Sequence, residues 1–309
     1  MEKRQLGSSE LIVSRLGLGC MSLGTDEKAA RQIIEAALAE GINYFDTANI
    51  YDFGTNERIV GQALKNVREQ VVIATKVGNR WQESQPGFSW DASKAYIKEE
   101  VKQSIKRLGT DYIDLYQLHG GTIDDRIKET IEAFEELKAE GYINYYGISS
   151  IRPNVIREYI DKSNIVSNMM QYSMLDRRPE EEALALLLER KISVVARGPL
   201  ASGLLSQQLL GKASASVLAK GYLNYSYEEL TELLPLLKEK LADSLGRSFT
   251  EVAMQFCLTN PAIAAVVAGA SSIEQLRENV AAVRSNPLTK DEIDLIKQLT
   301  KANHYELHR

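Results

Sequence analysis

The strongest constraint on the fold is a regular alternation of short apolar runs with longer amphipathic segments along the whole chain. The runs are too short for helices and have the composition of buried strands. The predicted strands are residues 16–18, 44–46, 71–76, 113–117, 145–149, 166–170, 193–196 and 265–268. Between them, apolar residues recur at spacings of three and four, which predicts helices. The clearest predicted helices are residues 27–40, 93–108, 125–140, 179–190, 228–245 and 273–283.

Glycines follow several of these helices, as expected where a helix ends. They are Gly41, Gly109, Gly141 and Gly246. Strands separated by helices of this length must pair in parallel through crossovers. We therefore predict an α/β fold, a (β/α)8 TIM barrel, with an open doubly wound sheet as the alternative. Residues 3–6 and 12–14 predict a β-hairpin before the first barrel strand.

The 309 residues contain no proline- or serine-rich linker, so we predict one domain over residues 1–309. Two connections, residues 78–93 and 202–227, are too long for simple turns. Both contain aromatic residues, namely Trp81, Phe88, Trp90, Tyr222, Tyr225 and Tyr227. Since these connections leave the carboxyl ends of the third and seventh strands, we expect them to wall a pocket, with local packing as the alternative.

The charge and composition of the chain indicate which kinds of molecule it is expected to bind. A net charge of -5 and a pI near 5.5 indicate a small-molecule partner and neither nucleic acid nor an anionic membrane. Cys20 and Cys257 are the only cysteines, which favours a reducing compartment. No signal-peptide core or membrane-spanning run is present, so we expect a cytoplasmic protein. The sequence does not indicate an oligomeric state.

Four proton-handling side chains follow the ends of predicted strands. Asp46 and Tyr51 follow the second strand, Lys76 ends the third and His119 follows the fourth. Neighbouring parallel strands of a barrel end on the same face, so these four side chains are expected to form one polar site.

This set suits the reduction of a carbonyl group. A tyrosine has an ordinary pKa of about 10 and needs a nearby positive charge to act as an acid, which Lys76 can provide. Asp46 would keep the buried Lys76 charged, and His119 could donate a hydrogen bond to a carbonyl oxygen. No side chain supplies a hydride, so a cofactor is required. The alternatives are a structural ion pair between Asp46 and Lys76 and a hydrogen-bonded core histidine at position 119.

The pattern Gly41-x-Asn43-x-Phe45-Asp46-Thr47-Ala48-x-x-Tyr51, followed by Lys76 and Leu118-His119, resembles the aldo-keto reductase family. The resemblance extends over essentially the whole chain. It implies reduction of an aldehyde or ketone, with Tyr51 as the proton donor and NADPH as the favoured cofactor, NADH being possible. It also leaves open a nucleotide-binding regulatory subunit with little turnover, since the family includes channel-associated members.

The resemblance further implies a cofactor that lies extended over the carboxyl-end face of the barrel without a Rossmann domain. The residues that it places against the cofactor are Met21, Asp46, Ser149, Ser150, Gln171, Arg197, Gly198, Pro199, Leu200, Ser202, Leu204, Lys212, Gly269, Ser271, Gln275, Glu278 and Asn279. Taken singly, Ser149 could instead cap a helix, Gln171 could satisfy buried backbone and Gly269 could simply turn the chain.

Three positions depart from the family pattern. Arg197 stands where many members have an aromatic residue stacked on the nicotinamide, and a guanidinium can also stack but carries charge. Gly120-Gly121 replaces the common Trp-Pro after His119. Ser271 and Gln275 stand where NADPH-preferring members often carry Lys or Arg, which leaves Arg277 or Lys212 for a 2′-phosphate. A metal-dependent hydrolase is not expected, because two of the three histidines lie in the tail.

Overall fold

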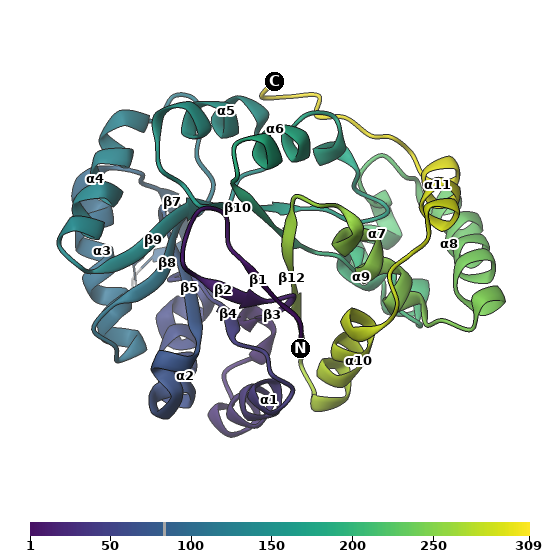
Figure 1. Cartoon of the computed structure of the whole chain (residues 1–309), viewed down its shortest axis with the longest axis horizontal. Helices are drawn as coiled ribbons and strands as arrows, with labels where there is room; N and C mark the ends of the chain where they lie inside the picture. The colour runs from purple at the N-terminus through teal and green to yellow at the C-terminus, as the bar shows by residue number, and fades with distance from the viewer. Residues whose placement is uncertain (83–84) are drawn as a thin grey trace.

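The computed structural model describes residues 1–82 and 85–309, without the side chains of Gln82, Gln85, Pro86 and Lys212. Eight parallel strands form a closed barrel (Figure 1). They are β3 (Leu16–Gly19), β4 (Tyr44–Asp46), β5 (Val72–Val77), β8 (Ile113–Leu118), β9 (Ile143–Ile148), β10 (Ser167–Gln171), β11 (Ser193–Arg197) and β12 (Ile263–Gly269). The barrel closes where β12 pairs with β3, with Val266 opposite Leu16. The predicted barrel is confirmed, and the open doubly wound sheet is excluded.

Helices surround the barrel on its outside (Figure 1). They are α1 (Glu27–Ala39), α2 (Thr55–Leu64), α3 (Lys94–Leu108), α4 (Ile127–Ala139), α5 (Pro153–Lys162), α6 (Ala183–Glu189), α7 (Ala215–Lys220), α8 (Tyr227–Leu241), α9 (Phe249–Thr259), α10 (Ile273–Arg284) and α11 (Lys290–Leu299). Side-chain caps fix several of their first turns. Asp26 accepts from two backbone N–H groups of α1, and Ser226 forms a reciprocal capping box with Glu229 in α8.

Two predicted helices are wrong at one end. The helix expected over residues 179–190 begins only at Ala183, because the chain first makes a short 3-10 turn, η4 (Arg178–Glu180). The helix expected over residues 228–245 ends at Leu241 and is followed by a second 3-10 turn, η7 (Asp243–Leu245).

Apolar side chains form two packed layers. Inside the barrel lie Tyr44, Leu115, Met169 and Val267, among others. The hairpin of β1 (Lys3–Gln5) and β2 (Ile12–Ser14) covers the amino end of the barrel with Leu6, Leu11 and Val13, which belong to the same buried cluster. A second and larger cluster fills the space between the barrel and the helices.

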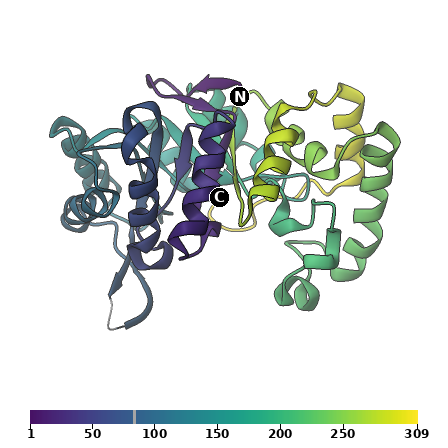
Figure 2. The same ribbon diagram turned by 90° about the horizontal axis from the view of Figure 1, so that it is seen from below.

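The two ends of the barrel differ (Figure 2). The β1–β2 hairpin lies over one end, and a second hairpin projects from the opposite end. This second hairpin consists of β6 (Asn79–Gln82) and β7 (Gln85–Trp90), with Asn79 opposite Trp90. Residues 78–93 were predicted as a long aromatic connection, and the hairpin lies within it. The other long connection, residues 202–227, contains helix α7 and a short 3-10 turn, η6 (Leu209–Lys212). Another 3-10 turn, η5 (Ala201–Gly203), overlaps the start of this connection.

Helix α2, which follows the Tyr51 segment, is held by buried polar contacts. The Glu57 carboxylate accepts a hydrogen bond from the Thr75 hydroxyl at 2.6 Å and pairs with the Arg107 guanidinium, also at 2.6 Å. On the same helix, a Cβ added to Gly61 would lie 1.9 Å from the carbonyl oxygen of Leu108 in α3. Close helix packing and a buried ion pair therefore fix α2 against β5 and α3.

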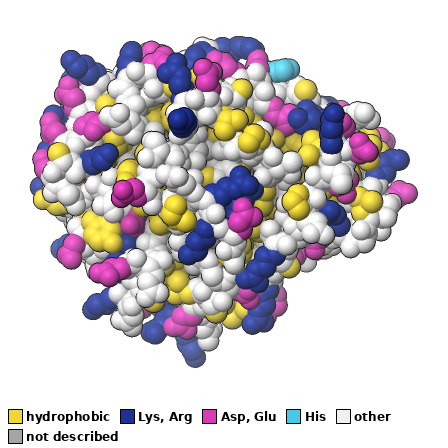
Figure 3. Space-filling model, in the orientation of Figure 1, with side chains coloured by type: hydrophobic (Ala, Val, Ile, Leu, Met, Phe, Trp, Pro, Cys, Tyr) yellow, Lys and Arg dark blue, Asp and Glu magenta, His cyan; other side chains and the backbone are white. Residues whose placement is uncertain are grey.

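The surface shown in Figure 3 carries acidic and basic side chains interspersed over the amino-end face. Among the helices that the structure describes, none combines the length and the apolar character needed to cross a membrane.

Candidate active site

The carboxyl ends of the barrel strands bring most of the predicted site residues to one face. Asp46 ends β4, Lys76 lies near the end of β5 and His119 directly follows β8. Around the same rim, Ser149 follows β9, Gln171 ends β10 and Arg197 ends β11. Because side chains alternate along a strand, the polar residues at these ends converge over the apolar barrel interior.

Lys76 and Asp46 form a buried ion pair. The Lys76 Nζ lies 2.6 Å from Asp46 Oδ1 and 2.7 Å from the carbonyl oxygen of Thr47, and the lysine is 1% exposed. Burial by itself lowers the pKa of Lys76, but Asp46 and then Tyr51 outweigh it, so its pKa is raised. Burial raises the pKa of Asp46, yet the two short contacts from Nζ to oxygen atoms favour the ionised pair.

Tyr51 lies between Lys76 and His119. The Lys76 Nζ is 5.2 Å from the centroid of the Tyr51 ring. The Tyr51 and His119 rings have centroids 6.2 Å apart and meet edge to face at 84°. Tyr51 is half-buried and begins a short 3-10 turn, η2 (Tyr51–Gly54), in which the next two residues are left-handed. The structure therefore brings Asp46, Lys76, Tyr51 and His119 together, as the strand-end argument predicted.

The imidazole of His119 is strongly biased toward its neutral form. Burial, followed by the charges of Lys76 and Arg197, lowers its pKa to about 3. Its Nδ1 is buried without a hydrogen-bond partner among the described residues. At neutral pH such a ring has one N–H donor and one acceptor nitrogen.

Two further polar residues of the site were not singled out from the sequence. Gln117 points into the barrel two residues before His119, and its amide helps to lower the pKa of Asp46. Asn49 is fully buried and donates from Nδ2 to the Asn79 carbonyl oxygen and to the Tyr96 hydroxyl. The alternation of side chains along β8 could have identified Gln117, because it shares the inward face with His119.

The structure accounts for the glycines after His119. The indole of Trp90, from the end of β7, lies against this turn, where a Cβ on Gly120 would be 3.4 Å from the ring and one on Gly78 would be 2.7 Å from it. Trp90 also donates from Nε1 to Asp125 Oδ1 at 2.8 Å. An aromatic side chain from a distant hairpin thus occupies the space beside position 120.

Arg197, at the end of β11, is hydrogen-bonded to a residue of the neighbouring strand β10. Its guanidinium donates to Gln171 Oε1 at 3.1 Å, and Gln171 Nε2 donates to the Tyr222 hydroxyl at 3.0 Å. Arg197 itself is exposed on the carboxyl-end face, and Tyr222 comes from the aromatic segment after β11. Gln171 therefore positions Arg197, a role that its place in the sequence did not indicate.

The segment after β11 has an unusual backbone. Ala201, Ser202 and Gly203 have consecutive positive φ angles of 47°, 58° and 92°. The N–H groups of Ala201 and Gly203 donate to the carbonyl oxygens of Gly198 and Leu200, and Ser202 is exposed. The predicted contact residues Gly198, Pro199, Leu200 and Leu204 lie in or beside this turn. Met21, across the barrel end, is 65% exposed.

Several residues that were predicted to contact the nicotinamide or the adenosine form hydrogen bonds with other residues of the protein. Ser150 is buried and exchanges hydrogen bonds with Asn168, whereas Ser149 is half-buried. In the adenosine segment, which begins at Gly269, the Ser271 hydroxyl donates to Gln275 Oε1 at 3.0 Å. Two other predicted adenosine contacts also form hydrogen bonds within the protein. Asn279 donates to the Gly269 carbonyl oxygen, and Glu278 accepts from Thr250. Arg277 is exposed beside them, and the side chain of Lys212 lies outside what the structure describes.

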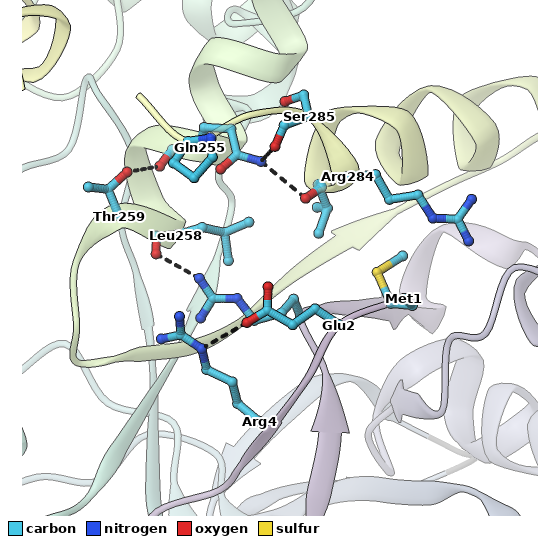
Figure 4. Close-up of a pocket in the computed structure, with 11 residues that line it drawn as sticks. Met1, Glu2, Arg4, Gln255, Leu258, Thr259, Arg284 and Ser285 are labelled. Carbon is cyan, nitrogen blue, oxygen red and sulfur yellow. Dashed lines mark hydrogen bonds and ion pairs between the residues drawn. The ribbon is translucent and has the colours of Figure 1, made fainter. Parts of the chain in front are cut away.

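A cavity of about 470 Å³ lies at the other end of the barrel (Figure 4). It is lined by Met1, Glu2, Arg4, Arg15, Gln255, Leu258, Thr259, Val283, Arg284, Ser285 and Pro287. Arg15 donates to the carbonyl oxygens of Leu258 and Ile263, and burial lowers its pKa to about 10. These contacts close the barrel at its amino end, whereas the active sites of such barrels lie at the carboxyl end.

Comparisons with known proteins agree with this geometry. The chain is 58% identical to the uncharacterized oxidoreductase YqkF of Bacillus subtilis (strain 168), over all of both chains. It is 32% identical to the NADH-specific methylglyoxal reductase of Escherichia coli (strain K12), covering 98% of this chain and 99% of that protein.

A solved structure, the aldo-keto reductase AKR11C1 from Bacillus halodurans in its holo form, superposes with a TM-score of 0.93 at 58% identity. The match covers 100% of this chain and 99% of that one. The sequence profile of the aldo/keto reductase family matches residues 15–301. The chain therefore belongs to the aldo/keto reductase family.

Proposed function

We propose that this protein reduces an aldehyde or ketone to an alcohol with a reduced nicotinamide cofactor. One observation carries the proposal: a buried ammonium, Lys76, is held by Asp46 directly beside the ring of Tyr51, and a neutral imidazole adjoins the same ring. Membership of an oxidoreductase family supports the reaction class. The assignment of individual roles rests on the geometry.

Tyr51 is the proposed proton donor. As the carbonyl carbon accepts a hydride, its oxygen gains negative charge and takes the phenolic proton of Tyr51, so that an alcohol forms and a phenolate remains. The Lys76 ammonium stabilises that phenolate electrostatically until solvent returns the proton. Asp46 contributes indirectly, because its carboxylate and the Thr47 carbonyl oxygen hold the ammonium in place.

His119 is proposed to orient the carbonyl. A neutral imidazole can donate one hydrogen bond to the carbonyl oxygen without placing a further cation beside Lys76. The depressed pKa of about 3 ensures this state throughout the physiological range.

The carboxyl-end face has a donor set that fits a nicotinamide dinucleotide. When bound, the reduced cofactor supplies the hydride that no side chain can provide. The exposed Ser202 offers its hydroxyl to a pyrophosphate, and Ser149 and Gln171 offer side chains to a carboxamide. The exposed Arg277 suits a 2′-phosphate, so we propose NADPH as the preferred cofactor.

A relative that is named as NADH-specific makes cofactor preference an experimental question. Dissociation constants for NADPH and NADH should be compared in the wild type and in Arg277→Ala. We expect Arg277→Ala to weaken NADPH roughly 10-fold and to leave NADH unchanged, because only NADPH has the phosphate. Equal effects on both cofactors would contradict the assignment of Arg277.

Replacing Tyr51 by Phe tests the proposed chemistry. We expect kcat to fall roughly 100-fold or more, which is typical of losing a general acid, while the dissociation constant for NADPH stays within about 2-fold. Tyr112→Phe is the matched control, because Tyr112 precedes β8 at the opposite end of the barrel. Full activity in Tyr51→Phe would refute the mechanism. Cofactor binding by the wild type without turnover of any aldehyde would instead favour a nucleotide-binding regulatory subunit.

A further inference from the structure

The cavity of about 470 Å³ at the amino end of the barrel lies on the face opposite the proposed active site (Figure 4). We call it the amino-end cavity. Three parts of the chain form its walls: the β1–β2 hairpin and the residue that follows it, the end of α9, and the end of α10. Cavities of this size hold small organic molecules. The amino-end cavity is therefore large enough for a metabolite.

The buried charge of this cavity belongs to Arg15, which directly follows β2. Its side chain is 5% exposed, and its guanidinium donates to the carbonyl oxygens of Leu258 at 2.7 Å and Ile263 at 2.8 Å. A longer contact of 3.3 Å reaches the Ala264 carbonyl oxygen. Within the described part of the chain, no carboxylate bonds to this guanidinium. A full positive charge is thus held by neutral oxygens alone.

The other arginines of the cavity have carboxylate partners. Arg4 pairs with Glu2 at 3.4 Å, and Arg284 pairs with Glu40 at 2.7 Å. At Arg15 the positive charges prevail, because burial and then Arg4 lower its pKa to about 10, and Glu2 raises it by less. The guanidinium is still charged at neutral pH. It would therefore be stabilised by an anion that entered the cavity.

Closing the barrel end does not by itself require this charge. Gln255, which is also buried, bonds the end of α10 with a neutral amide that donates to the carbonyl oxygens of Ala282, Val283 and Ser285. Arg15 does the same for Leu258, in the last turn of α9. The end of a helix carries only about half a negative charge, which compensates a guanidinium in part. The remaining positive charge has no counterpart in the contacts of Arg15.

The donors and the walls of the cavity together define a ligand. A guanidinium has five N–H groups, and the contacts to carbonyl oxygens use at most three of those of Arg15, so at least two remain. Two N–H groups of one guanidinium match the two oxygens of a carboxylate. The apolar side chains of Leu258, Val283 and Pro287 line the same cavity. They suit a carbon chain attached to that carboxylate.

We propose that the amino-end cavity binds a small organic monocarboxylate, whose carboxylate accepts from Arg15 and whose carbon chain lies against Leu258, Val283 and Pro287. One carboxylate balances one guanidinium, whereas a dicarboxylate or a phosphate ester would bring a second negative charge without a partner. The inference goes beyond the proposed reduction and does not depend on it, because the cavity and the Tyr51 site lie at opposite ends of the barrel.

Hexanoate is the probe for this site. Its dissociation constant should be measured by isothermal titration calorimetry, with and without saturating NADPH, next to hexan-1-ol and inorganic phosphate. We expect a value on the order of 1 mM or below for hexanoate, as its size allows. NADPH should leave this value unchanged, and hexan-1-ol and phosphate should each bind at least about 10-fold more weakly, since each lacks either the charge or the carbon chain.

Two variants locate the bound hexanoate. We expect Arg15→Gln, which removes the charge, and Val283→Phe, which fills the cavity, each to weaken hexanoate at least about 10-fold. Val283→Phe leaves the contacts of Arg15 in place and keeps the test decisive if Arg15→Gln does not fold, as judged by circular dichroism. Arg58→Gln is the matched control, because it removes a positive charge from an arginine outside the cavity that pairs with Glu27 at 2.7 Å. It should change the dissociation constant by less than about 2-fold.

Several results would overturn the proposal. Absence of hexanoate binding, or binding that Val283→Phe leaves unchanged, would show that the amino-end cavity is not the site. Displacement of hexanoate by NADPH would place it on the carboxyl-end face. Hexan-1-ol binding as tightly as hexanoate would remove the role of Arg15, and phosphate binding as tightly would indicate a general anion site in place of one for monocarboxylates.

Discussion

The neutral state of His119 leads to a quantitative prediction about pH. Burial and the charges of Lys76 and Arg197 lower the pKa of His119 to about 3, against an ordinary value of about 6.5. At pH 6 about one molecule in a thousand would then carry the imidazolium in the folded state. We therefore expect no step in kcat/KM between pH 5 and 8 that depends on His119.

The same value predicts a loss of stability in acid. Between about pH 6.5 and pH 3 the unfolded chain binds a proton at His119 that the folded protein does not bind, so the free energy of unfolding falls as the pH falls. The full effect is about 5 kcal/mol, reached only near pH 3. Between pH 7.5 and pH 5, where measurement is practical, the loss from this residue is about 2 kcal/mol.

The assay compares the wild type with His119→Asn. Urea unfolding at pH 7.5 and pH 5 should show a stability loss that is about 2 kcal/mol larger for the wild type, since other titrating groups affect both proteins alike. The chain has three histidines, so the imidazole signal that is missing in the variant assigns His119 by NMR. An imidazole that titrates above about pH 5, or a difference between the two proteins that does not change with pH, would refute the reasoning.

Two substitutions test how the site is supported. Asp46→Asn leaves the buried Lys76 ammonium without its counter-charge, and we expect a loss of about 3–5 kcal/mol in the free energy of unfolding, measured with urea. An unchanged midpoint would show that the ion pair is not needed to keep Lys76 buried. Gly61→Ala places a Cβ 1.9 Å from the Leu108 carbonyl oxygen, so thermal unfolding should occur at least about 5 °C lower, whereas Gly211→Ala meets no atom within 4 Å and should be neutral. Equal melting temperatures for the two variants would contradict the packing of α2 on α3.

Strand positions were predictable because each barrel strand is a short apolar run with its own helix behind it. The polar site followed from the same pattern, since Asp46, Lys76 and His119 each stand where an apolar run ends. Helix α9 was missed because apolar residues cover it on every side, which removes the amphipathic periodicity. Helix α2 was missed for the opposite reason, because it buries the polar side chains of Asn56 and Glu57.

Contacts between distant segments could not be predicted from local pattern. In the sequence, the two glycines after His119 suggest that the space beside them is empty. The structure shows that Trp90, thirty residues earlier in the chain, fills this space. The residues next to Arg197 in the sequence likewise do not reveal its hydrogen-bond partner. Only the pairing of β10 with β11 places Gln171 directly beside it. Both contacts depend on the register of the barrel and on the β6–β7 hairpin, which no single segment encodes.

In the proposed mechanism, the charges of the site act together on the carbonyl oxygen. Lys76 is paired with Asp46, whereas within the described part of the chain the hydrogen-bond partner of Arg197 is the neutral amide of Gln171. Burial, followed by the charges of Lys76 and Arg197, lowers the pKa of His119, and the same two charges would favour negative charge on a phenolate or a carbonyl oxygen. An imidazolium would be costly here, because the ring is buried and two cations already lie near. The neutral histidine and the charged lysine therefore both follow from burial together with the neighbouring charges, and in the proposed mechanism His119 orients the substrate while Lys76 stabilises the charge that develops.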